Sequence, residues 1–172
     1  MLFERWFPDE VCPSAYAVDY EALASEGIRG VIFDIDNTLV PHGAPADEAA
    51  AALFGHLRKL GLSACLISNN SEPRVKPFAD AVGARYLHKA GKPSGRGYRE
   101  ACRMMGVSPR EAVFIGDQIF TDIWGAKRAG IRCILTDPID PKEEIQIILK
   151  RIPEKLVMAA YRRHLRKKSE KP

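Results

Sequence analysis

The sequence VIFDIDNTLV at residues 31–40 begins as an apolar strand and ends in two carboxylates, Asp34 and Asp36. Residues i and i+2 of an extended chain lie on one side of it, so both carboxylates can face one pocket. Two neighbouring carboxylates repel each other unless a cation or a shared proton relieves the repulsion. Such an oxygen-rich site suits Mg²⁺, which keeps several waters and a substrate phosphate in its shell. The alternative is that one aspartate caps the turn that follows at Asn37 and Thr38.

Short apolar runs alternate with stretches of helical periodicity on the C-terminal side of this segment. The expected strands lie at residues 30–34, 63–68, 85–87, 112–116 and 131–136, and the expected helices at 47–60, 72–82, 94–105 and 121–129. This alternation is typical of βαβ units and a parallel sheet. The sequence therefore predicts an α/β fold with a mostly parallel sheet.

Composition predicts an ordinary globular protein. The chain has 172 residues, of which 46% are hydrophobic and 28% charged, so we expect a single domain at 1–149, with its motifs at 29–136, followed by a basic tail or helix at 150–172. The four cysteines form no CxxC pair, which argues against a disulfide framework or a zinc site. The N-terminus does not read as a signal peptide, and no apolar run approaches the roughly 20 residues that span a bilayer. We expect a cytoplasmic protein, at most peripheral to the inner face of the membrane.

Positive charge is concentrated at the C-terminal end. Residues 150–172 hold nine basic and two acidic side chains, a net +7, whereas residues 1–149 hold 17 basic and 20 acidic side chains, a net −3. Within 150–168 the basic groups accompany the apolar residues Ile152, Leu156, Val157, Ala160 and Leu165. A basic amphipathic helix can lie on an anionic bilayer. Alternatively, the helix packs its apolar stripe on the sheet, or the tail touches RNA.

Two further motifs follow expected strands, and ligands of parallel sheets bind at the carboxyl ends of strands. In LISNN, residues 66–70, the hydroxyl of Ser68 precedes backbone amides that enter a helix, which makes an anion site. The alternative is that Ser68 or Asn70 only caps the helix that starts near Glu72. Lys92 precedes a proline, which disfavours helical angles, and its ammonium can neutralise phosphate charge. Lys89 and Arg96 compete for this role.

The last motif is VFIGDQIFTD at residues 113–122. Gly116 allows a tight turn after a strand, so Asp117 falls at the pocket rim as a candidate metal ligand. Asp122 could orient a metal-bound water or Lys92. The alternative is that Asp117 caps the next helix and Asp122 is an acid in its first turn, where the helix dipole favours it.

The ordered set D-x-D-x-T, Ser, Lys and GDxxxxD, over about residues 29–136, resembles the haloacid dehalogenase (HAD) superfamily of phosphatases. The segments WFPDE, GIRGVIFDIDNTLVP, SNNSEPRV and GDQIFTDIWGA are similar to the capless, subfamily IIIA, YqeG-like members, which are similar to phosphatidylglycerophosphate phosphatases. The resemblance implies a three-layer α/β/α Rossmann-like fold without a cap domain. It also implies Mg²⁺-dependent hydrolysis of a phosphate monoester, phosphatidylglycerophosphate to phosphatidylglycerol. The alternatives are a phosphatase of a small metabolite, nucleotide or phosphoprotein, and a ribosome- or RNA-associated binding protein.

The resemblance also implies a role for each motif residue. Asp34 would be the nucleophile that forms an aspartyl-phosphate, and Asp36 the general acid and then base. Lys92 would be the cation that stabilises both the nucleophile and the aspartyl-phosphate intermediate. The implied phosphate-binding residues are Asn37, Thr38, Ser68, Asn69 and Lys92. The implied metal site comprises Asp34, Asp36 through its main-chain carbonyl, Asp117 and Asp122.

Motif spacing bears on the substrate. Only 33 residues lie between Asp34 and Ser68, and 23 between Ser68 and Lys92, so neither interval has room for a cap domain. We therefore expect an open site that suits a phosphate on something large, such as a lipid at a membrane surface, a protein or a nucleic-acid end. Of these, the family resemblance favours a lipid over nucleic acid. A neighbouring copy of the chain in a homo-oligomer could supply the missing cover.

Overall fold

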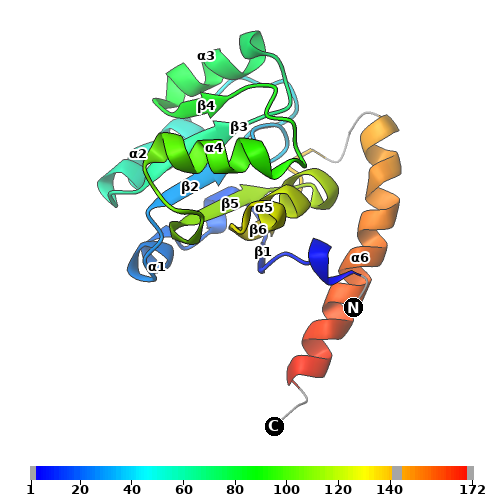
Figure 1. The fold of residues 1–172 in the computed structure, drawn as a ribbon. Helices are drawn as coiled ribbons and strands as arrows, with labels where there is room; N and C mark the ends of the chain where they lie inside the picture. Colours follow the sequence, from blue (N-terminus) through cyan, green and yellow to red (C-terminus); the bar gives the residue numbers. More distant parts are fainter. Residues whose placement is uncertain (1–2, 141–144, 170–172) are drawn as a thin grey trace.

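The computed structural model describes residues 3–140 and 145–169, and within them six strands form one sheet (Figure 1). Every pairing in this sheet is parallel, and the strand order is β1-β6-β5-β2-β3-β4. The strands are Glu10–Cys12 (β1), Gly30–Phe33 (β2), Ser63–Ile67 (β3), Arg85–Leu87 (β4), Ala112–Gly116 (β5) and Arg132–Thr136 (β6). The predicted α/β fold with a parallel sheet is confirmed.

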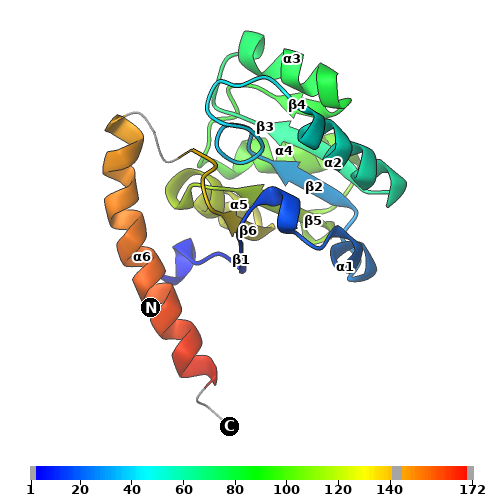
Figure 2. The same ribbon diagram turned by 180° about the vertical axis from the view of Figure 1, so that it is seen from behind.

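Helices cover both faces of the sheet. One face carries α1 (Tyr20–Ser25), α2 (Glu48–Lys59) and α3 (Glu72–Val82), and the other carries α4 (Gly95–Met105) and α5 (Trp124–Ala129) (Figures 1 and 2). The hydrophobic core is divided accordingly into two clusters, one on each side of the strands. The three-layer α/β/α arrangement expected from the sequence is therefore confirmed.

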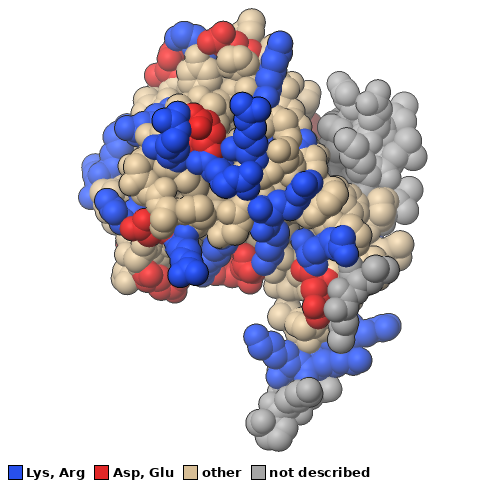
Figure 3. Space-filling model, viewed as in Figure 1, with Lys and Arg blue, Asp and Glu red and all other residues tan. Residues whose placement is uncertain are grey.

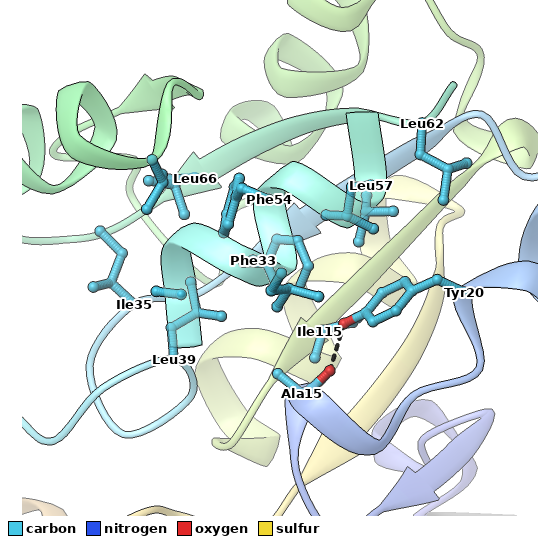
Figure 4. Packing of buried hydrophobic residues seen from close by; sticks show 14 of the residues in the cluster. Ala15, Tyr20, Phe33, Ile35, Leu39, Phe54, Leu57, Leu62, Leu66 and Ile115 are labelled. Atoms are coloured by element: carbon cyan, nitrogen blue, oxygen red, sulfur yellow. Dashed lines mark hydrogen bonds between the residues drawn. The ribbon is translucent and has the colours of Figure 1, made fainter. Parts of the chain in front are cut away.

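The central strand β2 explains why the core has two halves. All of its side chains are buried, as expected of a parallel strand with helices on both faces. Because side chains alternate along a strand, Phe33 packs with the α1–α3 side, whereas Ile32 packs with the α4–α5 side. Phe33 lies against Phe54 of α2, and the hydroxyl of Tyr20 donates to the carbonyl of Ala15 (2.6 Å) beneath it (Figure 4).

Two N-terminal elements were not among the predicted ones. Strand β1 is an edge strand that pairs with β6, where Glu10 lies opposite Ile134, but three residues are too few to show an alternation. Helix α1 begins after Asp19, whose carboxylate accepts from the amide of Ala22 (2.8 Å). Its six residues are also too few for a periodic pattern.

Helix α6 (Ile145–Ser169) begins five residues before the boundary expected at 150. It packs on the domain through Val157 and Tyr161, which are buried, and Tyr161 contacts the ring of Phe7 with centroids 5.4 Å apart. Leu156 and Leu165 are 65% and 46% exposed. The apolar stripe expected at 150–168 is therefore divided between a packed face and an exposed one.

Part of that expected tail lies outside the described residues, namely the side chains of 150–152, including Ile152, the side chain of 169, and residues 170–172. Of the helices in the described ranges, none is both long enough and apolar enough to cross a membrane.

The strand order predicts where in the sheet a ligand binds. From the central β2 the chain continues to β3 and β4 on one side, and then to β5 and β6 on the other. The order therefore reverses between β2 and β5, and parallel sheets bind ligands at the carboxyl ends of strands beside such a reversal. Between β2 and β4 the described chain holds only loops, α2, β3 and α3, so this part of the structure contains no cap domain.

Candidate active site

Three buried carboxylates meet where β2 and β5 end. Asp34 follows β2, and its amide donates to the carbonyl of Ile115 in β5 (3.0 Å), so the strand pairing continues to the site. Asp117 follows β5, and Asp122 lies in η4 (Ile119–Ile123), one turn of π-helix. Each of the three carboxylates has an oxygen within 4.8 Å of the others. The strand-end motifs expected to converge therefore do converge.

Lys92 lies among these carboxylates. Its Nζ donates to Oδ1 of Asp34 (2.5 Å) and to Oδ1 of Asp122 (2.7 Å), and its side chain is only 5% exposed. The side chain of Asn69 holds the Lys92 backbone, because its Oδ1 accepts from the Lys92 amide (2.8 Å) and its Nδ2 donates to the Lys92 carbonyl (3.0 Å). Lys89 and Arg96, the competing candidates, are exposed and line a different hollow.

The charges of this cluster do not balance. Three carboxylates and one ammonium have a formal net charge of −2 in a buried place. Burial raises the pKa of Asp34, the Lys92 ammonium opposes this, and Asp122 and Asp117 raise the pKa further. Burial would lower the pKa of Lys92, but Asp122 and Asp34 hold it well above its usual value. A divalent cation would balance the charge, and carboxylate oxygens are ligands that Mg²⁺ accepts. Asp34, Asp117 and Asp122 therefore fit a divalent metal.

The loop after β2 contributes two of the expected phosphate-binding residues, in different ways. Asn37 has a positive φ of 63° and lines the hollow beside Asp34; asparagine is among the residues that tolerate this conformation best. Thr38 is buried, and its hydroxyl donates to Oδ1 of Asp117 (3.2 Å). The Thr38 hydroxyl therefore contacts the Asp117 carboxylate of the candidate metal site.

The carboxylate of Asp36 is held by three donors. It accepts from the amide of Gly43 (2.8 Å), from Nδ2 of Asn70 (2.8 Å) and from a terminal nitrogen of Arg74 (2.7 Å). Burial would raise the pKa of Asp36, but the bonds from Arg74 and Gly43, together with the charges of Arg74 and His42, hold it below its usual value. These contacts stabilise the negative charge of Asp36, which lines the same hollow as Asp34.

Arg74 was not among the predicted site residues. It lies in the first turn of α3, within the SNNSEPRV segment that supported the family resemblance. Composition and periodicity gave no reason to separate it from the other arginines, because an arginine on a helix is usually exposed.

A hollow of about 220 Å³ lies at this end of the sheet. Six predicted residues line it: Asp34, Asp36, Asn37, Ser68, Asn69 and Lys92. The lining also includes Asn70, the last residue of the LISNN motif, and His42, Gln118 and Thr121, which had no expected role. His42 and Gln118 lie in loops and Thr121 lies in the short turn η4, and segments this short have no periodic pattern that would mark single residues.

Close packing fixes Asp122. A β-carbon at position 116 would lie 2.6 Å from Oδ2 of Asp122, so glycine is needed there for a spatial reason. The amide of Gln118 donates to the same oxygen (3.1 Å). The hydroxyl of buried Tyr98 donates to the carbonyls of Thr121 (2.8 Å) and Asp122 (3.1 Å). These contacts hold the turn that carries Asp122 in place.

Comparison with known proteins places this arrangement in a family. The profile of the haloacid dehalogenase-like hydrolases matches residues 41–130. The chain is 32% identical to "Probable phosphatase YqeG" of Bacillus subtilis, and the match covers 95% of both chains. It is 34% identical to "Phosphatidylglycerophosphate phosphatase 1, chloroplastic/mitochondrial" of Arabidopsis thaliana, over 87% of this chain but only 45% of the plant protein.

Among solved structures, a deoxy-D-mannose-octulosonate 8-phosphate phosphatase of Haemophilus influenzae has the same fold, with a TM-score of 0.50 and 13% identity over 67% of this chain and 81% of that one. The protein belongs to the haloacid dehalogenase-like hydrolase family. The predicted enzyme class, a phosphatase of this family, is confirmed by the family and by the relatives named as phosphatases.

Proposed function

We propose that this phosphatase hydrolyses phosphate monoesters through an aspartyl-phosphate on Asp34, with Mg²⁺ as its metal, and that its substrate is phosphatidylglycerophosphate. The observation that carries the proposal is the buried Asp34 carboxylate, which lies 2.5 Å from Lys92 Nζ and within one cluster with Asp117 and Asp122. The neighbouring hollow, lined by Ser68 and Asn69, suits a phosphate group.

The chemistry follows from the positions of these groups. A carboxylate oxygen of Asp34 attacks phosphorus, and the bond from phosphorus to the leaving oxygen breaks. Lys92 stays protonated and offsets the repulsion between the anionic nucleophile and the anionic phosphate. Mg²⁺, held by Asp34 and Asp117 with Asp122 beside them, would supply further positive charge at the phosphate when bound.

Asp36 acts on the leaving group. It gives a proton to the departing oxygen, and in the second half of the reaction it takes a proton from the water that attacks phosphorus and frees Asp34. Arg74 and Asn70 position its carboxylate for both steps. Because three donors favour its ionised form, Asp36 is better prepared in this state to act as the base than as the acid.

Several observations support a lipid substrate. The plant relative is named as a phosphatidylglycerophosphate phosphatase, and no cap domain covers the hollow in the described chain. Helix α6 exposes Leu156 and Leu165 among basic side chains, which gather on its lower part in Figure 3. This face suits contact with an anionic membrane and would hold the enzyme at the cytoplasmic surface.

The catalytic proposal is tested by phosphate release with Mg²⁺ from two substrates, phosphatidylglycerophosphate in mixed micelles and p-nitrophenyl phosphate. We expect faster release from the lipid, and loss of both activities in Asp34→Asn and after chelation of the metal. Asp80→Asn removes an exposed carboxylate of α3 and should keep both activities. Activity on p-nitrophenyl phosphate alone would refute the lipid assignment, and full activity of Asp34→Asn would refute the mechanism.

Membrane contact is tested by flotation with vesicles that contain or lack phosphatidylglycerol. The variant Lys155→Gln/Arg163→Gln/Lys167→Gln removes three exposed charges of α6. Each basic group near an anionic surface contributes about 1 kcal/mol, so binding should weaken by about 100-fold. Lys59→Gln/Arg110→Gln removes exposed charges elsewhere and serves as the control. Equal flotation with both kinds of vesicle would contradict the proposal.

A further inference from the structure

A second and larger hollow lies beside the catalytic one. It has a volume of about 670 Å³ and lies between the end of β4 and the first half of α4. Its polar lining comes from His88, Lys89, Ser94, Arg96 and Glu100. We call it the flank cavity. None of its lining residues belongs to the catalytic hollow, and the proposed mechanism uses none of them.

One segment forms a wall of both cavities. Gly91 lines the flank cavity and Lys92 lines the catalytic hollow, and neighbouring Cα atoms in a chain are about 3.8 Å apart. The same segment is bonded to the loop that carries Ser68, because the amide of Lys89 donates to the carbonyl of Asn70 and the amide of Ala90 donates to that of Ser68, both at 2.9 Å. A ligand that reaches over this wall can therefore occupy both cavities.

The wall is fixed against α4. A β-carbon at Gly97 would lie 2.6 Å from the carbonyl oxygen of Ala90, so helix and segment are in close contact. This contact fixes the backbone of Ala90, next to Lys89, relative to that of Gly97, next to Arg96. A binding site whose backbone is already in place loses less conformational entropy when a ligand binds.

The charge of the flank cavity favours an anion. Lys89 and Arg96 both line the cavity, and both are exposed. The carboxylate of Glu100 is engaged by Arg103, which donates to it from Nε (2.9 Å) and from a terminal nitrogen (2.5 Å). Lys and Arg side chains also gather over α4 in the view of Figure 3. Because Arg103 neutralises Glu100, the charges of Lys89 and Arg96 leave the net charge of the lining positive.

We infer that the flank cavity binds a second anionic group of the substrate, a phosphodiester, while the phosphomonoester occupies the catalytic hollow. This inference rests on the proposed function and adds Lys89 and Arg96 as residues that determine specificity. Both contact the part of the substrate that does not react, so they contribute binding energy that a simple monoester cannot use.

The test uses two water-soluble substrates, which removes any effect of membrane binding. Glycerophosphoglycerol phosphate carries a monoester and a diester, whereas glycerol 1-phosphate carries the monoester alone. In Lys89→Gln/Arg96→Gln we expect kcat/KM for the first substrate to fall by about tenfold or more, mainly through KM, and kcat/KM for the second to stay within about twofold. The control Lys59→Gln/Arg110→Gln removes the same charge and should change neither. An equal loss on both substrates, or no loss on either, would overturn the inference.

A binding experiment separates this inference from the catalytic proposal. Glycerophosphoglycerol carries the diester but has no monoester to hydrolyse, so its binding can be followed by NMR even if the protein turns over neither substrate. We expect it to shift the amide signals of Gly91 and Gly97 in the wild type and in the control variant, but not in Lys89→Gln/Arg96→Gln. If inorganic phosphate shifts these signals and glycerophosphoglycerol does not, the cavity is not a phosphodiester site.

Discussion

The Nζ of Lys92 lies 2.5 Å from Oδ1 of Asp34, although 58 positions separate the two residues in the chain. The loop after β4 brings Lys92 to the end of β2, and the side chain of Asn69 holds that loop through the amide and the carbonyl of Lys92. Lys92 is the cation whose contacts join Asp34 and Asp122, so the cluster depends on it both for structure and for charge.

Replacement of Lys92 by methionine should lower both activity and stability. The variant leaves three buried carboxylates without their ammonium, and removal of one partner of a buried ion pair costs about 3–5 kcal/mol. Thermal unfolding should show a larger loss of stability in chelator than in excess Mg²⁺, because a bound cation replaces part of the missing charge. Phosphate release should fall by about 100-fold or more. Lys59→Met, on the exposed end of α2, should change neither quantity, and a Lys92→Met enzyme that is as stable as wild type in chelator would refute this account.

Replacement of Thr38 by valine distinguishes two roles of its hydroxyl. If the hydroxyl orients Asp117, as the 3.2 Å contact indicates, loss of it should weaken metal binding by about tenfold or more. The Mg²⁺ concentration for half-maximal activity should then rise, while KM at saturating Mg²⁺ stays nearly constant. Thr136→Val is the control, because the Thr136 hydroxyl is buried and has no hydrogen-bond partner among the described residues. A rise in KM without a change in the Mg²⁺ requirement would instead assign Thr38 to the phosphate.

Replacement of Arg74 by glutamine should affect substrates according to their leaving groups. Arg74 positions Asp36, and protonation by Asp36 matters most for an alkoxide, which is a poor leaving group. We expect kcat to fall by about tenfold or more on an alkyl phosphate and by much less on p-nitrophenyl phosphate. Arg74→Lys should restore part of the loss, and Arg110→Gln should have no effect. Equal losses on both esters would show that Arg74 acts in another way.

The contribution of Asp9 to the free energy of unfolding should depend on pH. Burial alone would raise the pKa of Asp9, but an ion pair with Lys127 and a bond from the amide of Cys133 (2.9 Å) hold it below its ordinary value of 3.8. A lowered folded-state pKa contributes stability that is present above 3.8 and is lost as the pH falls through the folded value.

Asp9→Asn should therefore be less stable than wild type at about pH 7, and the difference should shrink at about pH 3. Urea unfolding at the two pH values measures the change. Asp80→Asn, which removes an exposed carboxylate on α3, should give a difference that varies little with pH. A stability gap for Asp9→Asn that widens on acidification would contradict the assignment.

Most of the site could be predicted because its residues follow apolar strands. Asp34, Asp117 and Ser68 each end such a run, and the ends of parallel strands meet at one edge of a sheet. Lys92 was found in a different way, from the proline that follows it and from the order of the motifs. The helical layers followed equally well from periodicity, as in α2 and α4.

The rest depends on contacts that no local pattern contains. Arg74 reaches Asp36 across 38 positions, and nothing in its own turn of helix distinguishes it from an exposed arginine. The partner of the Thr38 hydroxyl is set by where β5 ends, 79 positions further on. Strand β1 has three residues, and its place in the sheet depends on the edge that β6 offers. In each case the missing information is a long-range contact.

Through Glu154, helix α6 also contacts the turn that carries Asp122. The buried carboxylate of Glu154 accepts from the amide of Ile119 (2.8 Å), the first residue of the turn that also carries Asp122. The basic helix and the candidate metal site are therefore joined by one hydrogen bond to the same short turn. Any displacement of α6 along or away from the domain must break this bond or carry the turn with it. If α6 binds a membrane as proposed, any shift of the helix on binding would also move the turn that carries Asp122, and membrane binding would then be coupled to catalysis.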